Sequence, residues 1–149
     1  MNRESIDLFR AERICSALSR KNGVITHVAV KEYAALSSEL RIAQATQGSL
    51  EEFASLHRER LNAARAELLH APGGSGLRFN SAAVGEAQYL QHLIAKSLRY
   101  HQIEIRQIEA DLVQAQQRLN QCELLKRIIE ARYSYAKRLR REQQEEHCS

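Results

Sequence analysis

The side chains in this chain most able to do chemistry are two histidines, His57 and His101, which both fall on the apolar seam described below. They could meet if two helices pair in the right register, and two imidazoles with a carboxylate would make a metal site. No acidic residue shares the seam there. The simpler interpretation is that the two histidines are polar seam residues that fix the alignment of the helices. We therefore expect no metal and no cofactor.

The cysteines, Cys15, Cys122 and Cys148, are an odd number without the spacing of a disulfide framework. Such usage is typical of a reduced intracellular protein. In an antiparallel helix pair of this length Cys15 lies opposite the region near residue 138, too far from Cys122 for a disulfide. We expect free thiols.

Catalytic motifs are missing from the sequence. There is no Ser-His-Asp order, glycine-rich phosphate loop, CxxC pair or carboxylate pair in a plausible cleft. A slim helix pair offers surfaces and no concave pocket, which argues against catalysis and against a small-molecule substrate. We expect no catalytic residues.

The elements that position these residues are two long helices, because both halves of the chain repeat apolar residues at an alternating three-then-four spacing. Such phasing is typical of coiled coils, and it predicts an all-α, antiparallel two-helix coiled-coil hairpin with a glycine-rich connecting loop. In the first half the seam consists of Tyr33, Leu36, Leu40, Ala43, Leu50, Ala54, Leu61, Ala64 and Leu68. In the second half it consists of Val84, Ala87, Ile94, Leu98, Ile105, Ile108, Leu112, Ala115, Leu119, Cys122, Ile129, Tyr133 and Ala136.

The predicted boundaries form a single helical hairpin over residues 1–149. The first helix covers 1–70, a loop covers 71–85, the second helix covers 86–142, and a frayed tail covers 143–149. Two glycines are doubtful points within the first helix. Gly23 precedes a β-branched run and marks a weak point, whereas a kink is expected at Gly48.

Composition agrees with long helices and a thin core, since the 149 residues include no Trp, three Phe and one Pro. Charged residues interrupt the first turns, so no secretory signal peptide is expected. No stretch approaches the roughly 18 apolar residues that span a bilayer. These features predict a cytoplasmic protein.

The net charge of +4 is concentrated at one end of the expected hairpin. Antiparallel pairing brings Arg10 and Arg13 close to the arginine-rich stretch that ends at Arg141. Leu124, Leu125, Ile128 and Leu139 widen the apolar face near the same end. Three interpretations stay open: a solvated face, a nucleic-acid surface, or a docking site for an acidic protein partner. Nucleic acid is the least favoured, because few aromatic residues lie among the arginines.

The start, Ile6-Asp7-Leu8-Phe9-Arg10-Ala11-Glu12-Arg13, and the close, Tyr133-Ser134-Tyr135-Ala136-Lys137-Arg138-Leu139-Arg140-Arg141, look like paired terminal ends. In length, helix layout and charge distribution the chain resembles the FliJ/YscO family. These are the central stalk proteins of bacterial flagellar and injectisome type III secretion systems. The injectisome branch of plant pathogens, the Hrp type, is the nearer likeness.

The resemblance implies a non-enzymatic stalk whose paired ends enter the ring of a hexameric secretion ATPase at the cytoplasmic face of the inner membrane. It also implies contacts with an export-gate membrane protein and with secretion chaperones. Carried over, the ATPase contacts would be Arg10, Arg13, Arg132, Lys137, Arg138 and Arg140. The export-gate contacts would include Phe79 and Tyr89.

Two other classes of function remain. A standalone coiled-coil adaptor or export chaperone would bind a helical partner along a groove. A nucleic-acid-binding coiled coil would use the basic end alone.

Overall fold

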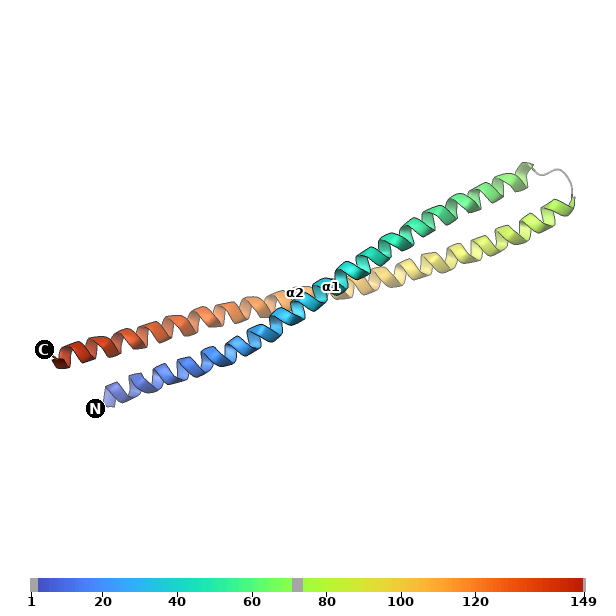
Figure 1. Cartoon of the computed structure of the whole chain (residues 1–149). Coiled ribbons are helices and arrows are strands. Elements are labelled where there is room, and N and C mark those ends of the chain that lie inside the picture. The colour runs from blue at the N-terminus through green and yellow to red at the C-terminus, as the bar shows by residue number, and fades with distance from the viewer. Residues whose placement is uncertain (1–2, 71–73, 149) are drawn as a thin grey trace. The chain divides into compact units, whose positions relative to one another are not determined.

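The computed structural model describes residues 3–70 and 74–148, and the side chains of residues 3–67 and 82–148. It consists of two helices, α1 (Arg3–His70) and α2 (Gly74–Cys148), and the described residues contain no strand (Figure 1). The two helices pack against each other in antiparallel orientation. The predicted all-α two-helix hairpin is confirmed.

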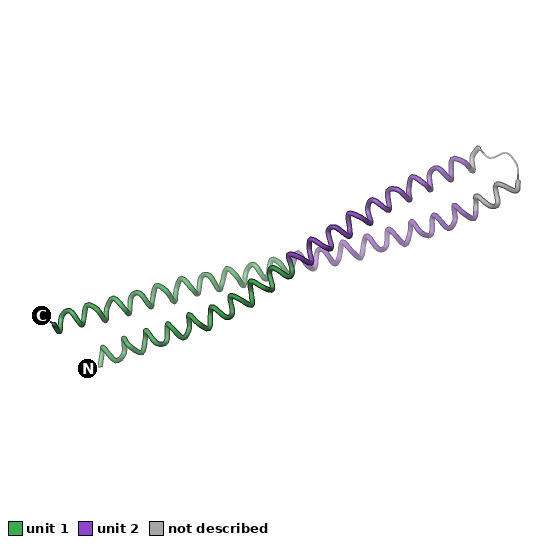
Figure 2. The backbone as a smooth tube through the Cα atoms, in the orientation of Figure 1, with its two compact units in different colours: residues 1–36, 111–149 green, residues 37–110 purple. Residues whose placement is uncertain are grey.

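The hairpin divides into two compact units (Figure 2). Unit 1 comprises Met1–Leu36 and Asp111–Ser149, so it pairs the start of α1 with the end of α2. Unit 2 comprises Ser37–Ala110. Each unit therefore holds one stretch of each helix, and each has its own core.

The predicted seam is confirmed at every position whose side chain is described, because all of these residues are buried or half-buried. The prediction for Leu68 lies outside the described side chains. The three-four spacing also continues toward the N-terminus through Ala29, Asn22, Cys15 and Glu12, which are all buried. The heptad spacing of the α1 seam is therefore the same in the two units. Toward the N-terminus its buried residues become polar or small.

α1 continues without interruption through Gly23, the following β-branched run and Gly48. A β carbon added at either glycine would meet nothing within 4 Å, so neither position needs glycine for space. The seam on the flanking turns outweighs the low helix propensity of these residues. α1 spans Arg3–His70, within the predicted first helix 1–70.

The predicted boundaries of the second helix are wrong at both ends. α2 begins at Gly74 and not at 86, so the predicted loop 71–85 is helical from Gly74 onward. The helix formers Ala82, Ala83 and Glu86 offset a cost of about 1 kcal/mol per glycine. Residues 71–73 of the predicted loop lie outside the described residues.

At its other end α2 runs to Cys148, through most of the predicted frayed tail. The reason is a set of contacts with the start of α1. Ser5 Oγ donates to Gln143 Oε1 at 3.3 Å, and Gln143 Nε2 donates to Glu4 Oε2 at 3.3 Å. The helix therefore stays paired beyond residue 142.

Candidate partner-binding surface

The two chain ends lie side by side in unit 1, as the contacts of Gln143 with Ser5 and Glu4 show (Figure 1). Farther along the same unit, Arg118 Nη1 binds both carboxylate oxygens of Glu32 at 2.7 Å. Together these contacts fix the antiparallel register of unit 1. They therefore determine which residues of α1 lie opposite which residues of α2 in this unit.

A charged pair lies within the seam near the chain ends. Arg140 Nη1 contacts Glu12 Oε2 at 2.8 Å, and the Glu12 side chain is only 11% exposed. Glu12 Oε1 and Arg140 Nε are buried without a hydrogen-bond partner. A buried ion pair with unsatisfied atoms contributes little net stability, but it strongly disfavours other registers in which either charge would be alone.

A second polar contact lies farther from the chain ends. The buried Asn22 donates from Nδ2 to the backbone carbonyl oxygen of Cys122 at 3.1 Å. Cys15, Cys122 and Cys148 are all free, which confirms the expected free thiols. Cys15 shares pocket walls with Ile129 and Tyr133, so it lies several residues from the predicted level near residue 138.

The buried apolar residues of unit 1 are all small, whereas those of unit 2 include long aliphatic side chains. In unit 1 they are Cys15, Ala29, Ala115, Cys122 and Ala136. In unit 2 they are Ala43, Leu61, Ile94, Ile105 and Ile108. Unit 2 therefore buries its large seam residues more completely than unit 1 does, and burial of apolar area stabilises a helix pair.

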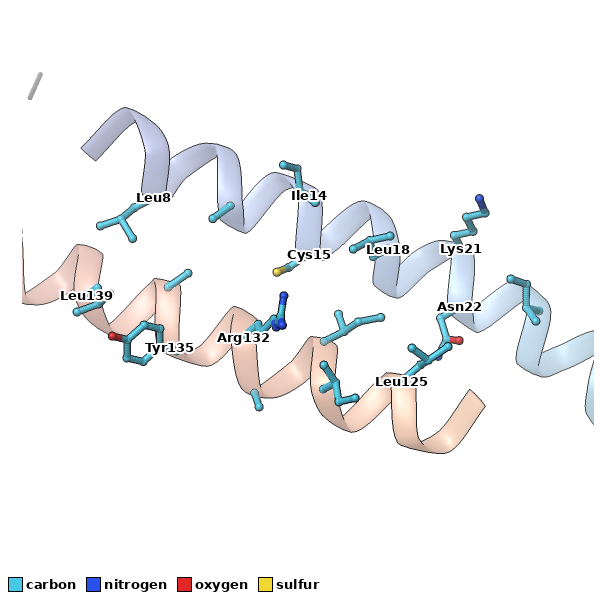
Figure 3. Close-up of a pocket in the computed structure, with 16 residues that line it drawn as sticks. Leu8, Ile14, Cys15, Leu18, Lys21, Asn22, Leu125, Arg132, Tyr135 and Leu139 are labelled. Atoms are coloured by element: carbon cyan, nitrogen blue, oxygen red, sulfur yellow. The ribbon is translucent and has the colours of Figure 1, made fainter. Parts of the chain in front are cut away.

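An open groove of about 940 Å³ lies beside the seam of unit 1 (Figure 3). Large apolar residues from both helices line it, including Ile14 and Leu18 on α1 and Ile128 and Leu139 on α2. The prediction that the hairpin has no concave pocket is therefore wrong for unit 1. The walls of this groove are formed by the large side chains one position before the seam, which remain mostly exposed.

Sequence reasoning found only the α2 half of this apolar surface. Leu125, Ile128 and Leu139 line the groove as part of the widened apolar face, whereas Leu124 is exposed and does not line it. The α1 half was missed. Ile14, Leu18 and Ile25 carry the same three-four periodicity one position before the seam, which is the signal that could have revealed them.

The structure brings the predicted ATPase-binding residues together in unit 1 but in different environments. Arg10, Arg13, Arg132 and Arg138 are exposed, and Lys137 is half-buried. Arg140 differs from the others, because its guanidinium forms an ion pair with Glu12.

Three of these cations lie over aromatic rings. The guanidinium carbon of Arg13 is 6.0 Å from the ring centre of Phe9, and that of Arg138 is 5.5 Å from Tyr135. Lys137 Nζ is 5.8 Å from the ring centre of Tyr133. Each contact is within one helix and restricts the cation to the helix surface while leaving its charge accessible.

The two residues predicted to contact an export gate lie in unit 2. Tyr89 is exposed on α2, as an interaction residue would be. The side chain of Phe79 lies outside the described residues.

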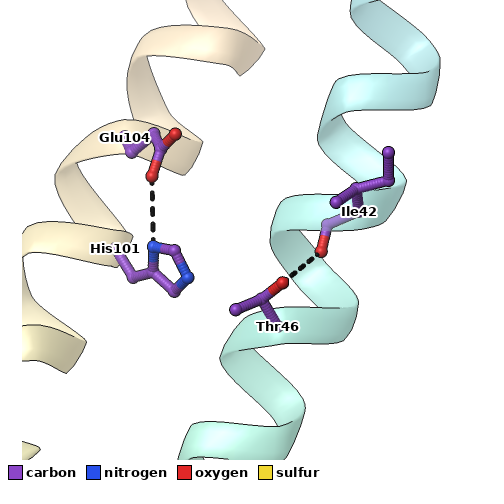
Figure 4. A network of polar contacts seen from close by, with 4 residues as sticks. All are labelled: Ile42, Thr46, His101 and Glu104. Atoms are coloured by element: carbon purple, nitrogen blue, oxygen red, sulfur yellow. Dashed lines mark hydrogen bonds and ion pairs between the residues drawn. The ribbon is translucent and has the colours of Figure 1, made fainter.

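The possible meeting of His57 and His101 does not occur. His57 Nε2 donates to the backbone carbonyl oxygen of Ala87 at 2.8 Å, and its ring stacks on Phe53. His101 Nδ1 contacts Glu104 Oε2 at 3.1 Å on its own helix, and Thr46 of α1 bonds within its own helix to Ile42 (Figure 4). Each histidine is thus a partly buried polar residue in the seam.

Within the side chains that the structure describes, no three histidine, cysteine or acidic residues are grouped to hold a metal ion. No helix among the described residues is long and apolar enough to cross a membrane. Comparison with models of protein families, with curated proteins and with solved structures found no match to this chain. The geometry of unit 1 is therefore the basis on which a function can be inferred.

Proposed function

We propose that the protein is a non-enzymatic coiled-coil stalk of a type III secretion apparatus. In this proposal the paired chain ends dock into the ring of the hexameric secretion ATPase, and unit 2 contacts the export-gate membrane protein and secretion chaperones. The protein would act in the bacterial cytoplasm at the inner membrane. Hydrolysis belongs to the ring, and the stalk supplies no catalytic group.

The observation that carries the proposal is the pairing of the chain ends at Ser5 and Gln143. This pairing brings the exposed cations of α1, Arg10 and Arg13, to the same end of unit 1 as Arg138 of α2. A basic end is attracted to an acidic ring lumen at long range, and apolar residues near it determine the fit at contact. The resemblance in length and charge distribution supports the same role.

The test is the turnover of the purified secretion ATPase from the same organism with increasing amounts of the full chain. A stalk raises turnover and saturates at about one chain per ring. Arg13→Glu with Arg138→Glu should abolish the stimulation, because both cations are exposed and their loss leaves the seam intact. The matched control is Arg58→Glu with Arg60→Glu, which changes the same charge in unit 2.

Arg140→Glu is unsuitable for this test, because it would place a second carboxylate beside the buried Glu12. If ATPase turnover is indifferent to the wild-type chain, or falls equally with both double variants, the stalk proposal is wrong. Helicity measured by circular dichroism should be the same in all three proteins.

An adaptor or export chaperone is the second candidate function, favoured by the exposed apolar residues of unit 1. It would copurify with a helical partner and leave the ATPase unaffected. Nucleic-acid binding would instead show an affinity that falls steeply with salt.

A further inference from the structure

The groove of unit 1 is flanked by a second apolar stripe on each helix, one residue before the seam. The α1 stripe is Ala11, Ile14, Leu18, Lys21 and Ile25. The α2 stripe is Leu125, Ile128, Arg132, Tyr135 and Leu139. Both stripes follow the three-four spacing of a coiled-coil seam, and both line the same groove (Figure 3).

Two seams on each helix are more than a two-helix coiled coil needs. A helix with one neighbour presents one seam, whereas a helix in a three-helix bundle presents two, one toward each neighbour. In unit 1 the fully buried apolar residues between α1 and α2 are small, while Ile14, Leu18 and Ile128 remain at least 42% exposed in the second stripes. The second stripes therefore leave large apolar side chains exposed along the groove.

The stripes end where the surface becomes polar. Glu32 and Arg118, which occupy the next corresponding positions beyond Val28 and Gln121, form the bidentate ion pair at 2.7 Å. A helix lying in the groove would therefore contact about three heptads, from the level of Leu8 to that of Ile25.

Charge identifies the kind of helix. The groove is lined by two cations, Lys21 on α1 and Arg132 on α2, and by no carboxylate. The register places them about one helical turn apart along the axis, roughly 5 Å at 1.5 Å per residue. A second copy of unit 1 docking groove to groove would bring cations against cations, and this disfavours self-association.

We propose that the groove of unit 1 binds one amphipathic helix of a partner protein, with apolar residues at heptad spacing and carboxylates on both flanks of its apolar face, about one turn apart, facing Lys21 and Arg132. The bound helix completes a three-helix bundle. This inference goes beyond the stalk function and does not depend on the ATPase. The proposed site is the groove, whereas the ATPase test changes Arg13 and Arg138, which do not line it. The two proposals can therefore fail separately.

The probe is a synthetic three-heptad helix with leucine at the two seam positions and glutamate at both flanking positions of each heptad. A twin peptide carries lysine in place of glutamate. Binding of each labelled peptide to the full chain is measured by fluorescence anisotropy at low salt. The wild-type chain should bind the glutamate peptide about tenfold more tightly, as expected for two exposed charge pairs.

The charge-swapped chain, Lys21→Glu with Arg132→Glu, should reverse this preference and bind the lysine peptide. Leu18→Gln with Ile128→Gln should weaken both peptides more than tenfold, since the apolar contact is lost. The matched control is Val24→Gln, which changes an exposed apolar residue of unit 1 that does not line the groove. It should leave binding unchanged.

A preference that the charge swap fails to reverse would overturn the proposal, as would equal weakening by the control. Sedimentation equilibrium of the chain alone tests the second-copy alternative. A dimer that Leu18→Gln with Ile128→Gln dissociates would overturn it too, because the groove would already be filled. Groove-dependent binding to vesicles of phosphatidylserine and phosphatidylcholine, in preference to the peptides, would equally contradict it.

Discussion

Unit 1 and unit 2 are built from the same two helices, but they place their large apolar side chains differently. Unit 2 buries long aliphatic residues in the seam, and its Leu61 is only 1% exposed. The fully buried apolar residues of unit 1 are Ala and Cys, its larger seam residues such as Ile129 are only half-buried, and large apolar residues beside its seam line a groove. The same heptad spacing thus buries large seam residues more completely in unit 2 and leaves an apolar groove in unit 1.

The polar contacts differ in the same way. In unit 1 the helices are joined across the seam by Glu12 with Arg140 and by Asn22 with the carbonyl of Cys122. In unit 2 His57 Nε2 donates across the seam to the carbonyl oxygen of Ala87, whereas the hydroxyls of Thr46 and Ser49 donate to carbonyls of their own helix. Polar pairs specify a register at a cost in stability. Both units thus have a hydrogen bond across the seam, and unit 1 adds the buried ion pair of Glu12 with Arg140.

The largest effect should come from Leu61→Ala in unit 2. Truncating a fully buried leucine removes apolar area and leaves a cavity, so the free energy of unfolding should fall by about 3 kcal/mol. The control is Leu56→Ala, because Leu56 is exposed on the same helix. Urea unfolding followed by circular dichroism measures both. Equal losses for the two variants would contradict the assignment of the unit 2 core.

A smaller loss is expected when the buried pair of unit 1 is broken. Arg140→Leu leaves the carboxylate of Glu12 buried and unpaired, which should lower the free energy of unfolding by about 2 kcal/mol. Adding Glu12→Leu should return the free energy of unfolding to the wild-type value or above it, since two apolar residues then meet in the seam. If the double variant is less stable than Arg140→Leu, the pair stabilises the fold more than this account allows.

Sequence periodicity was enough to predict the hairpin, because the seam from Tyr33 to Leu61 and from Ala87 to Ala136 repeats without a change of phase. It was not enough to predict the ends of α2. Gln143 belongs to the helix through its contact with Ser5, and such a contact between distant residues has no local signal.

The candidate site was predictable only in part. The basic residues and the apolar face of α2 follow from the sequence, but the groove also needs Ile14, Leu18 and Ile25 of α1. Those residues flank a seam that is polar at Glu12 and Asn22. Because an apolar repeat is not visible at those seam positions, the sequence does not show that the neighbouring positions form a second stripe. The partner of Arg140 could not be predicted either, because it depends on the register.

Glycine substitutions should stabilise both units by similar amounts. Gly23→Ala in unit 1 and Gly48→Ala in unit 2 each add a methyl group that meets nothing within 4 Å. Each should raise the free energy of unfolding by about 0.8 kcal/mol through helix propensity alone. Thermal unfolding is the measurement. A loss at either position would show that its glycine permits a bend or a contact absent from this structure.

The smallest effect is expected at the ion pair that ends the groove. Glu32 and Arg118 are 40% and 50% exposed in their side chains, so solvent screens their attraction. Arg118→Gln should therefore lower the free energy of unfolding by about 0.5 kcal/mol at low salt. The difference from wild type should vanish near 1 M salt, where the Debye length is about 3 Å. A loss that salt does not change would point to packing by the arginine stem.

Amide hydrogen exchange of the full chain, alone and with the glutamate peptide, tests the contrast between the units most directly. We predict faster exchange in unit 1 than in unit 2 for the chain alone, and strong slowing on the peptide confined to residues 8–25 and 125–139. Equal protection of the two units without peptide, or slowing spread evenly over both, would contradict the account.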